Sequence, residues 1–225
     1  MLLLGFSSGL PFFLSGNTLG CWLRDSGTTL AAIGFLSWVG LAYSLKFLWA
    51  PIIDRVDAPL FGRLGRRRGW MVVSQILVAI GLTLLAVFGL SAGLAAVGIF
   101  ALVVAFSSST QDIVVDAWRI EAASDSDELG LLSSAYQLGY RAAIIVADAF
   151  ILISANHFGW RISYAAMAVL MAVGVGASLF AIEPLRAARA AGSRAETPLW
   201  SGRGLYDAII GPFREFSGPT AGWRC

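Results

Sequence analysis

Two carboxylates stand four residues apart in the most polar part of an otherwise apolar segment. Asp112 and Asp116 lie within residues 107–119, and their spacing places both on one face of a helix. Neighbouring carboxylates that are partly removed from water can exchange protons near neutral pH, which is what a proton carrier requires. The alternative is that both lie at the mouth of the segment and pair with Arg55 or Arg119.

A second polar stripe runs along the apolar residues 130–155 and contains Gln137, Tyr140, Arg141 and Asp148. Gln137 and Arg141 are one helical turn apart, and Asp148 lies two turns beyond Arg141. We expect such a stripe to face a water-filled cavity or other helices, because polar groups are costly in lipid. The guanidinium of Arg141 can bind an anionic substrate through a carboxylate, or it can form a structural pair with Asp112 or its neighbouring aspartate.

Lys46 lies about seven residues inside a second apolar segment, close to Tyr43. A lysine at this depth either extends its ammonium group to the membrane interface or faces a cavity. Gln111, next to the paired carboxylates, completes the set of candidate cavity residues on these segments.

The first apolar segment carries Asn17 and several hydroxyl residues, and we expect Pro11 to break it. Discontinuous helices lined with hydroxyl groups are typical of transporter binding sites. Small residues recur four apart at Gly5/Gly9 and Gly16/Gly20. This spacing predicts close packing of membrane helices.

The composition requires a membrane to position these residues. Of the 225 residues, 57% are hydrophobic and only 13% are charged, and the mean hydropathy is +0.75. A soluble domain carries about twice that share of charge, so this chain cannot build a soluble surface. We predict an all-α polytopic bundle of six transmembrane helices. The expected spans are residues 2–23, 31–53, 70–90, 94–117, 130–155 and 160–182.

Two units follow from this pattern: a six-helix bundle over residues 1–182 and a tail over residues 183–225. The first part of the tail is rich in Arg, Ala, Gly and Ser and is typical of a linker. Apolar residues recur at helical spacing over residues 205–216. This pattern favours an amphipathic helix on the membrane surface or, alternatively, the start of a seventh span.

The distribution of arginine predicts the orientation. The connections at 54–69, 118–129 and 183–200 hold nine arginines, whereas the opposite connections hold two. The positive-inside rule therefore places the first set, the N-terminus and the tail in the cytoplasm. The same rule explains the arginine cluster at 55–68, so we expect no nucleic-acid partner.

The sequence gives no sign of an enzyme, a cofactor or a metal site. Residues 5–9 match the G-x-S-x-G pattern of hydrolases, but they lie in an apolar helix and lack the strand–turn–helix context. The single histidine, His157, lies in an external loop. Cys21 and Cys225 have neither metal-ligand spacing nor the spacing of a disulfide framework.

Six stretches together resemble the AmpG-type muropeptide permease branch of the major facilitator superfamily. They are residues 4–11, 45–55, 65–70, 111–119, 138–141 and 159–161, and they occur in the family's order. Residues 54–67 also resemble the superfamily's loop between the second and third helices, which implies a gating role for Asp54, Arg55, Arg66 and Arg67. The loop departs from the pattern at Ala50, where glycine is usual, and by an insert at 56–64.

The resemblance implies a proton-coupled importer of muropeptides, N-acetylglucosaminyl-anhydromuramyl peptides, in the bacterial inner membrane. It implies a role in peptidoglycan recycling and β-lactamase induction. Relatives that carry acetyl-CoA share the fourth-span pattern, so a carrier of another anionic metabolite is an alternative. Relatives continue into a second six-helix half that this chain does not show. We therefore expect an N-terminal half from a truncated or frameshifted gene, which would need a C-terminal half or be a non-transporting membrane fragment.

Overall fold

The computed structural model describes residues 1–59, 61 and 64–184. The helix expected at 205–216 lies outside these residues. The described helices are α1 (Leu2–Ser15), α2 (Asn17–Asp25), α3 (Leu30–Leu36), η1 (Ser37–Gly40), α4 (Leu41–Ser44), η2 (Lys46–Leu48), α5 (Ala50–Arg55), α6 (Arg66–Phe88), η4 (Gly89–Ala92), α7 (Leu94–Ala122), α8 (Ser126–Ile144), η5 (Ile145–Phe150), α9 (Ile151–Phe158) and α10 (Trp160–Phe180).

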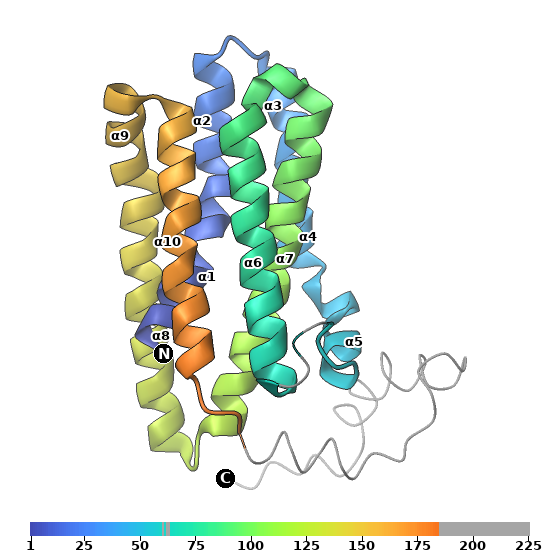
Figure 1. Ribbon diagram of the computed structural model, residues 1–225, viewed down its shortest axis with the longest axis vertical. Helices are drawn as coiled ribbons and strands as arrows, with labels where there is room; N and C mark the ends of the chain where they lie inside the picture. Colours follow the sequence, from blue (N-terminus) through green and yellow to red (C-terminus); the bar gives the residue numbers. More distant parts are fainter. Residues whose placement is uncertain (60, 62–63, 185–225) are drawn as a thin grey trace, which may run out of the picture.

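The described part of the chain is an all-α bundle, as predicted. Five helical segments are long and apolar enough to cross a membrane, and the bent pair Leu30–Ser44 and Lys46–Arg55 gives a sixth if it is counted as one span. The spans run side by side along the long axis of the molecule (Figure 1). The molecule is therefore a multi-pass membrane protein, and the six predicted spans correspond to its helices.

Successive spans alternate in direction, so the connections gather at two ends. Residues 56–59 and 123–125 lie at one end, together with the end of α10, and residues 26–29 and 89–93 lie at the other (Figure 1). The described connections of the arginine-rich group therefore lie at one end of the bundle, and those of the arginine-poor group lie at the other. Which end faces the cytoplasm stays a prediction.

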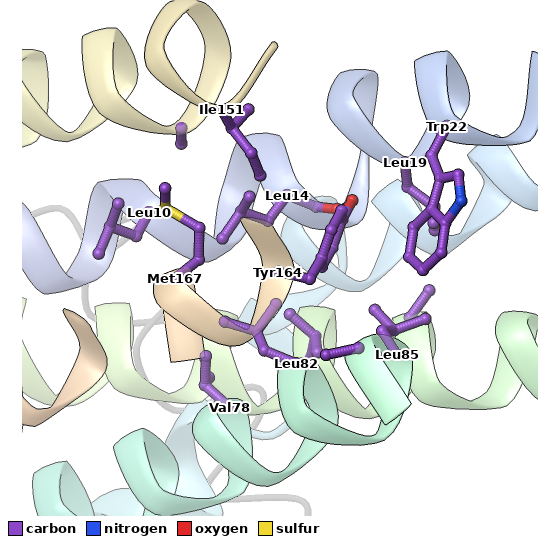
Figure 2. Packing of buried hydrophobic residues seen from close by; sticks show 14 of the residues in the cluster. Leu10, Leu14, Leu19, Trp22, Val78, Leu82, Leu85, Ile151, Tyr164 and Met167 are labelled. Atoms are coloured by element: carbon purple, nitrogen blue, oxygen red, sulfur yellow. The ribbon is translucent and has the colours of Figure 1, made fainter. Parts of the chain in front are cut away.

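The apolar core lies where the first, third and sixth spans meet. Leu10 and Leu14 of α1 pack with Leu82 of α6 and Met167 of α10, all of them buried (Figure 2). The hydroxyl of Tyr164 lies among these side chains and donates to the carbonyl oxygen of Leu14 at 2.8 Å. This bond satisfies a polar group in a region without water.

Glycines allow α1 and α8 to approach closely. A Cβ atom at Gly5 would collide with the carbonyl of Tyr136, and one at Gly9 would lie 2.8 Å from the carbonyl oxygen of Tyr140. Gly139 of α8 faces the carbonyl of Leu2 in the same way. The first predicted glycine pair therefore does pack helices.

The first span is broken at Gly16, so the break expected at Pro11 was wrong. Pro11 is buried inside the continuous helix α1, whereas Gly16 leaves the helical region with φ −108° and ψ −104°. Prolines are tolerated in membrane helices where neighbouring helices and Ser or Thr side chains satisfy the freed backbone groups.

Two further irregularities were not predicted. The second span bends by 40° at Leu45, between α4 and η2. The fifth span contains the π-helical turn η5, which carries Asp148. The hydroxyl of Thr18 donates to the carbonyl oxygen of Ala147 in this turn at 2.8 Å. Single π turns inside α-helices are frequent at functional sites.

Candidate functional site

The first, second, fourth and fifth spans bring one group of candidates together, which we call the Asp112 cluster: Ser8, Ser15, Tyr43, Lys46, Ser108, Gln111, Asp112, Tyr136 and Tyr140. Asp112 of α7 lies next to Ser8 of α1 and interacts electrostatically with Lys46 of η2. Tyr43 of α4 lies beside Ser15 and Ser108. The structure thus gathers residues far apart in the sequence around one carboxylate.

Gln111 fixes the position of α7 against α1 at this point. Its side-chain amide donates to the hydroxyls of Ser7 at 2.8 Å and Ser8 at 3.2 Å. Gln75 of α6 extends the network, because its amide donates to Ser7 at 3.4 Å and it accepts from Ser178 of α10 at 2.9 Å. These bonds join four spans and orient the helix that carries Asp112.

Several buried oxygen atoms of the cluster have no hydrogen-bond partner within the described residues. They are the hydroxyls of Tyr43 and Ser108, the amide oxygen of Gln111 and Oδ1 of Asp112. Buried polar atoms are normally satisfied, and ionisable residues inside the membrane generally serve a function. The cluster therefore has free capacity to bind protons, water or a polar ligand.

The two carboxylates at 112 and 116 occupy different environments, although the sequence places them on one face. Oδ1 of Asp116 accepts from Nη2 of Arg119 at 2.9 Å, and the Asp116 side chain is 41% exposed. The guanidinium of Arg119 also lies over the ring of Tyr136, 5.1 Å from its centroid. Asp116 thus shows the pairing considered as the alternative to a proton-carrying role.

The remaining cavity candidates divide between a groove and an exposed helix face. Asn17 and Asp148 line a groove with Tyr43, between the first, second and fifth spans. Gln137 and Arg141 lie exposed on α8. Among the described residues, no ion pair joins Arg141 to an aspartate of α7.

Two of the predicted gating residues, Asp54 and Arg67, pair at the end of the bundle where α5, α6 and α7 converge. Nη1 of Arg67 donates to Asp54 at 2.6 Å, and its Nη2 and Nε donate to the two carboxylate oxygens of Glu121 at 2.5 and 3.1 Å. The Arg67 side chain is only 5% exposed. Arg66 is also buried, and Arg55 lies at the end of α5.

Two carboxylates of this network were not among the residues predicted from the sequence. Glu121 lies on a turn of α7 beyond the predicted end of the fourth span. Glu183 follows α10, and its carboxylate accepts from the backbone N–H groups of Arg67 at 3.0 Å and Arg68 at 3.1 Å. An acidic group is favourable at the N-terminus of a helix, so Glu183 ties the end of the sixth span to the start of the third. In the sequence, each of the two is an acidic residue that follows a predicted span, Glu121 after the fourth and Glu183 after the sixth.

Comparisons with known proteins agree with this architecture. The family model for acetyl-coenzyme A transporter 1 matches residues 1–97. The chain is 36% identical to the anhydromuropeptide permease of Escherichia coli K12, over 99% of this chain and 43% of that protein. It is 41% identical to an uncharacterized protein of Haemophilus influenzae, over 78% of this chain and 40% of that one.

A third relative is the putative transporter AmpG 3 of Rickettsia prowazekii, which is 36% identical over 73% of this chain and 39% of that protein. The chain spans less than half the length of each of these relatives. Its likeness to membrane transporters extends over almost all of its own length. The resemblance to the AmpG-type permease family is thereby confirmed.

Proposed function

We propose that this chain forms one half of a proton-coupled transporter that imports muropeptides for peptidoglycan recycling and β-lactamase induction. The observation that carries the proposal is the Asp112 cluster, a carboxylate placed with Lys46 and unpartnered hydroxyls inside a membrane bundle. The name of the Escherichia coli relative supports the substrate. The chemistry is binding and release, so the protein acts as a carrier and not as an enzyme.

In this proposal Asp112 alternates between a protonated and a charged form. The charged form is stabilised by Lys46, and the neutral form can remain in the membrane interior without a partner. Gln111 holds the helix in place through its bonds to Ser7 and Ser8. Tyr43 lies between the carboxylate and the groove. Protonation of Asp112 can therefore change the affinity of the groove for a bound substrate.

Arg67, Asp54 and Glu121 serve as the gate in this proposal. Their ion pairs join the ends of α5, α6 and α7, so an opening of this end must rearrange a buried arginine. Leaving a buried arginine without its carboxylates is costly unless new partners form. The network therefore favours one state of the transporter until proton and substrate binding shift the balance.

We propose that a second bundle completes the cavity. The relatives are more than twice as long as the segment they share with this chain. Gln137 and Arg141 lie exposed on α8, where a polar face is unfavourable in lipid. A C-terminal half would cover this face, with the cytoplasmic ends set by the arginine-rich connections.

The test is uptake of labelled anhydro-muropeptide by a full-length relative that carries this segment, in cells lacking their own permease. We expect Asp112→Asn to abolish proton-coupled uptake while the amount of protein in the membrane stays unchanged. Asp116→Asn is the matched control, because its charge is already paired with Arg119, and it should retain uptake. Unchanged uptake and pH dependence in Asp112→Asn would contradict the proposal.

A second candidate function is transport of acetyl-CoA, favoured by the family model that matches residues 1–97. The same uptake assay separates the two substrates by competition. An excess of unlabelled acetyl-CoA that blocks labelled uptake, where unlabelled muropeptide does not, would favour the second candidate.

A further inference from the structure

A groove of about 590 Å³ opens between the first two spans and the π-helical turn of the fifth. Its volume lies within the roughly 300–1,000 Å³ of small-molecule sites. Its wall includes aromatic and polar side chains, among them Phe12, Phe13, Tyr43, Ser15, Asn17, Arg24, Ser37 and Asp148. The groove adjoins the Asp112 cluster through Tyr43 and is built wholly within the described residues.

Glycines keep this groove open. Gly16 separates α1 from α2, so the two halves of the span diverge and form one wall. A Cβ atom at Gly40 would meet nothing within 4 Å, and one at Gly20 would meet only Ile33 at 3.7 Å. These glycines therefore leave space for a ligand, in contrast to Gly5, which packs directly against α8.

The aromatic part of the wall is available for contact. Phe12 is 41% exposed, and it packs edge-to-face against Tyr43 with ring centroids 4.9 Å apart. Asn17 offers an amide that both donates and accepts, and Asp148 offers a carboxylate that accepts. An aromatic platform flanked by such groups matches a pyranose ring, which has an apolar C–H face and a rim of hydroxyls.

The charge of the groove also favours a neutral ligand. Asp148 and Arg24 contribute one charge of each sign, and no ion pair between them is found in the described part of the chain. The groove thus has no net charge to attract an anion. A zwitterion that spans the two charges is the competing occupant, and a free tripeptide tests for it.

We infer that this groove binds the saccharide part of the substrate, with Phe12 and Tyr43 against the sugar ring and Asn17 and Asp148 on its hydroxyls. The inference rests on the proposed function for the identity of the sugar. It leaves the peptide part of a muropeptide outside the groove, towards the exposed face of α8.

Cys21 lines the groove and is exposed, so its labelling reports occupancy directly. The 225-residue chain with Cys225→Ser, reconstituted in lipid nanodiscs, has Cys21 as its remaining thiol. We expect the peptide-free disaccharide N-acetylglucosaminyl-anhydromuramic acid, used as its uncharged lactyl amide at millimolar concentration, to slow maleimide labelling of Cys21 at least threefold. Free muropeptide-derived tripeptide and sucrose should leave the rate unchanged.

Gly40→Leu fills the groove and should abolish this protection, whereas Gly34→Leu is the matched control. Gly34 lies on α3, and a Cβ atom there also meets nothing within 4 Å, but it does not line the groove. Asp148→Asn, which preserves size, should weaken protection at least threefold even if the leucine variants fold poorly. Equal labelling with and without disaccharide, or protection by the tripeptide alone, would overturn the inference. If muropeptide uptake by the full-length relative persists in that case, the proposed function stands and only the groove assignment fails.

Discussion

Arg67 at the start of α6 holds Glu121 near the end of α7 through two parallel hydrogen bonds, of 2.5 Å from Nη2 and 3.1 Å from Nε. The Arg67 side chain is almost fully buried, and that of Glu121 is 22% exposed. A planar guanidinium paired in this way fixes direction as well as distance. The pair therefore sets how the third and fourth spans meet at this end of the bundle.

Glu121→Gln should destabilise the bundle, because one charged acceptor of a buried arginine becomes neutral while Asp54 remains. We expect a loss of roughly 1.5–3 kcal/mol, the range for a hydrogen bond to a charged group. The measurement is thermal unfolding in detergent. Asp57→Asn is the control, since Asp57 is exposed between α5 and α6 and should leave the Tm unchanged. Equal Tm values for both variants would show that the pair adds nothing to stability.

The positions of the spans follow from the amino-acid sequence, whereas the pairing of these carboxylates does not. Apolar runs of about 20 residues located all six spans, because their burial in lipid is a property of composition. Glu121 fell outside the predicted fourth span, since a charged residue after an apolar run is typical of a loop. Helix α7 in fact continues to Ala122, where Arg67 of another span supplies the compensating charge.

The breaks in the spans could not be read from the sequence for a similar reason. Pro11 predicted a break, yet α1 continues through it, and the span breaks at Gly16 beside the groove. The bend at Leu45 has no proline or glycine at that position. Such irregularities depend on which neighbouring helix can satisfy the freed backbone groups, and one sequence does not contain that information.

Gly139→Ala should separate α1 from α8. A methyl group there would collide with the carbonyl oxygen of Leu2, and backbone atoms cannot rotate away as side chains do. We expect a loss of about 1–3 kcal/mol, as for overpacking in a core, measured as a lower Tm. Gly98→Ala on α7 is the control, because a methyl group there meets nothing within 4 Å. A Tm that falls as much in the control would show that the α1–α8 contact is not the cause.

The orientation of the bundle is tested with topology reporters. The nine-to-two distribution of arginines between the two sets of connections predicts that a reporter fused after Arg68 is cytoplasmic. A reporter fused after Gly27, at the opposite end of the bundle, should be periplasmic. Alkaline phosphatase and green fluorescent protein give complementary signals on the two sides, and the reverse pattern would contradict the predicted orientation.

Lys46 and Asp112 should be energetically coupled, because their opposite charges interact electrostatically inside the bundle. Lys46→Met leaves the Asp112 carboxylate without its cation, and Asp112→Asn leaves the ammonium group of Lys46 without its anion. A charge left without its opposite inside the bundle is costlier than two neutral side chains. We therefore expect the double variant to be more stable than the sum of the two single losses predicts, by roughly 0.5–3 kcal/mol.

Thermal unfolding of the four proteins of this double-mutant cycle in nanodiscs measures the coupling. The sequence allows two orientations of the Lys46 side chain. Its ammonium group either faces the cavity or lies at the membrane interface. We propose the first, and the electrostatic interaction of Lys46 with Asp112 supports it. A lysine at the interface would be solvated by water and headgroups, and the two losses would then simply add. Additive losses would remove Lys46 from the proposed proton site and leave Asp112 to act with the surrounding hydroxyls.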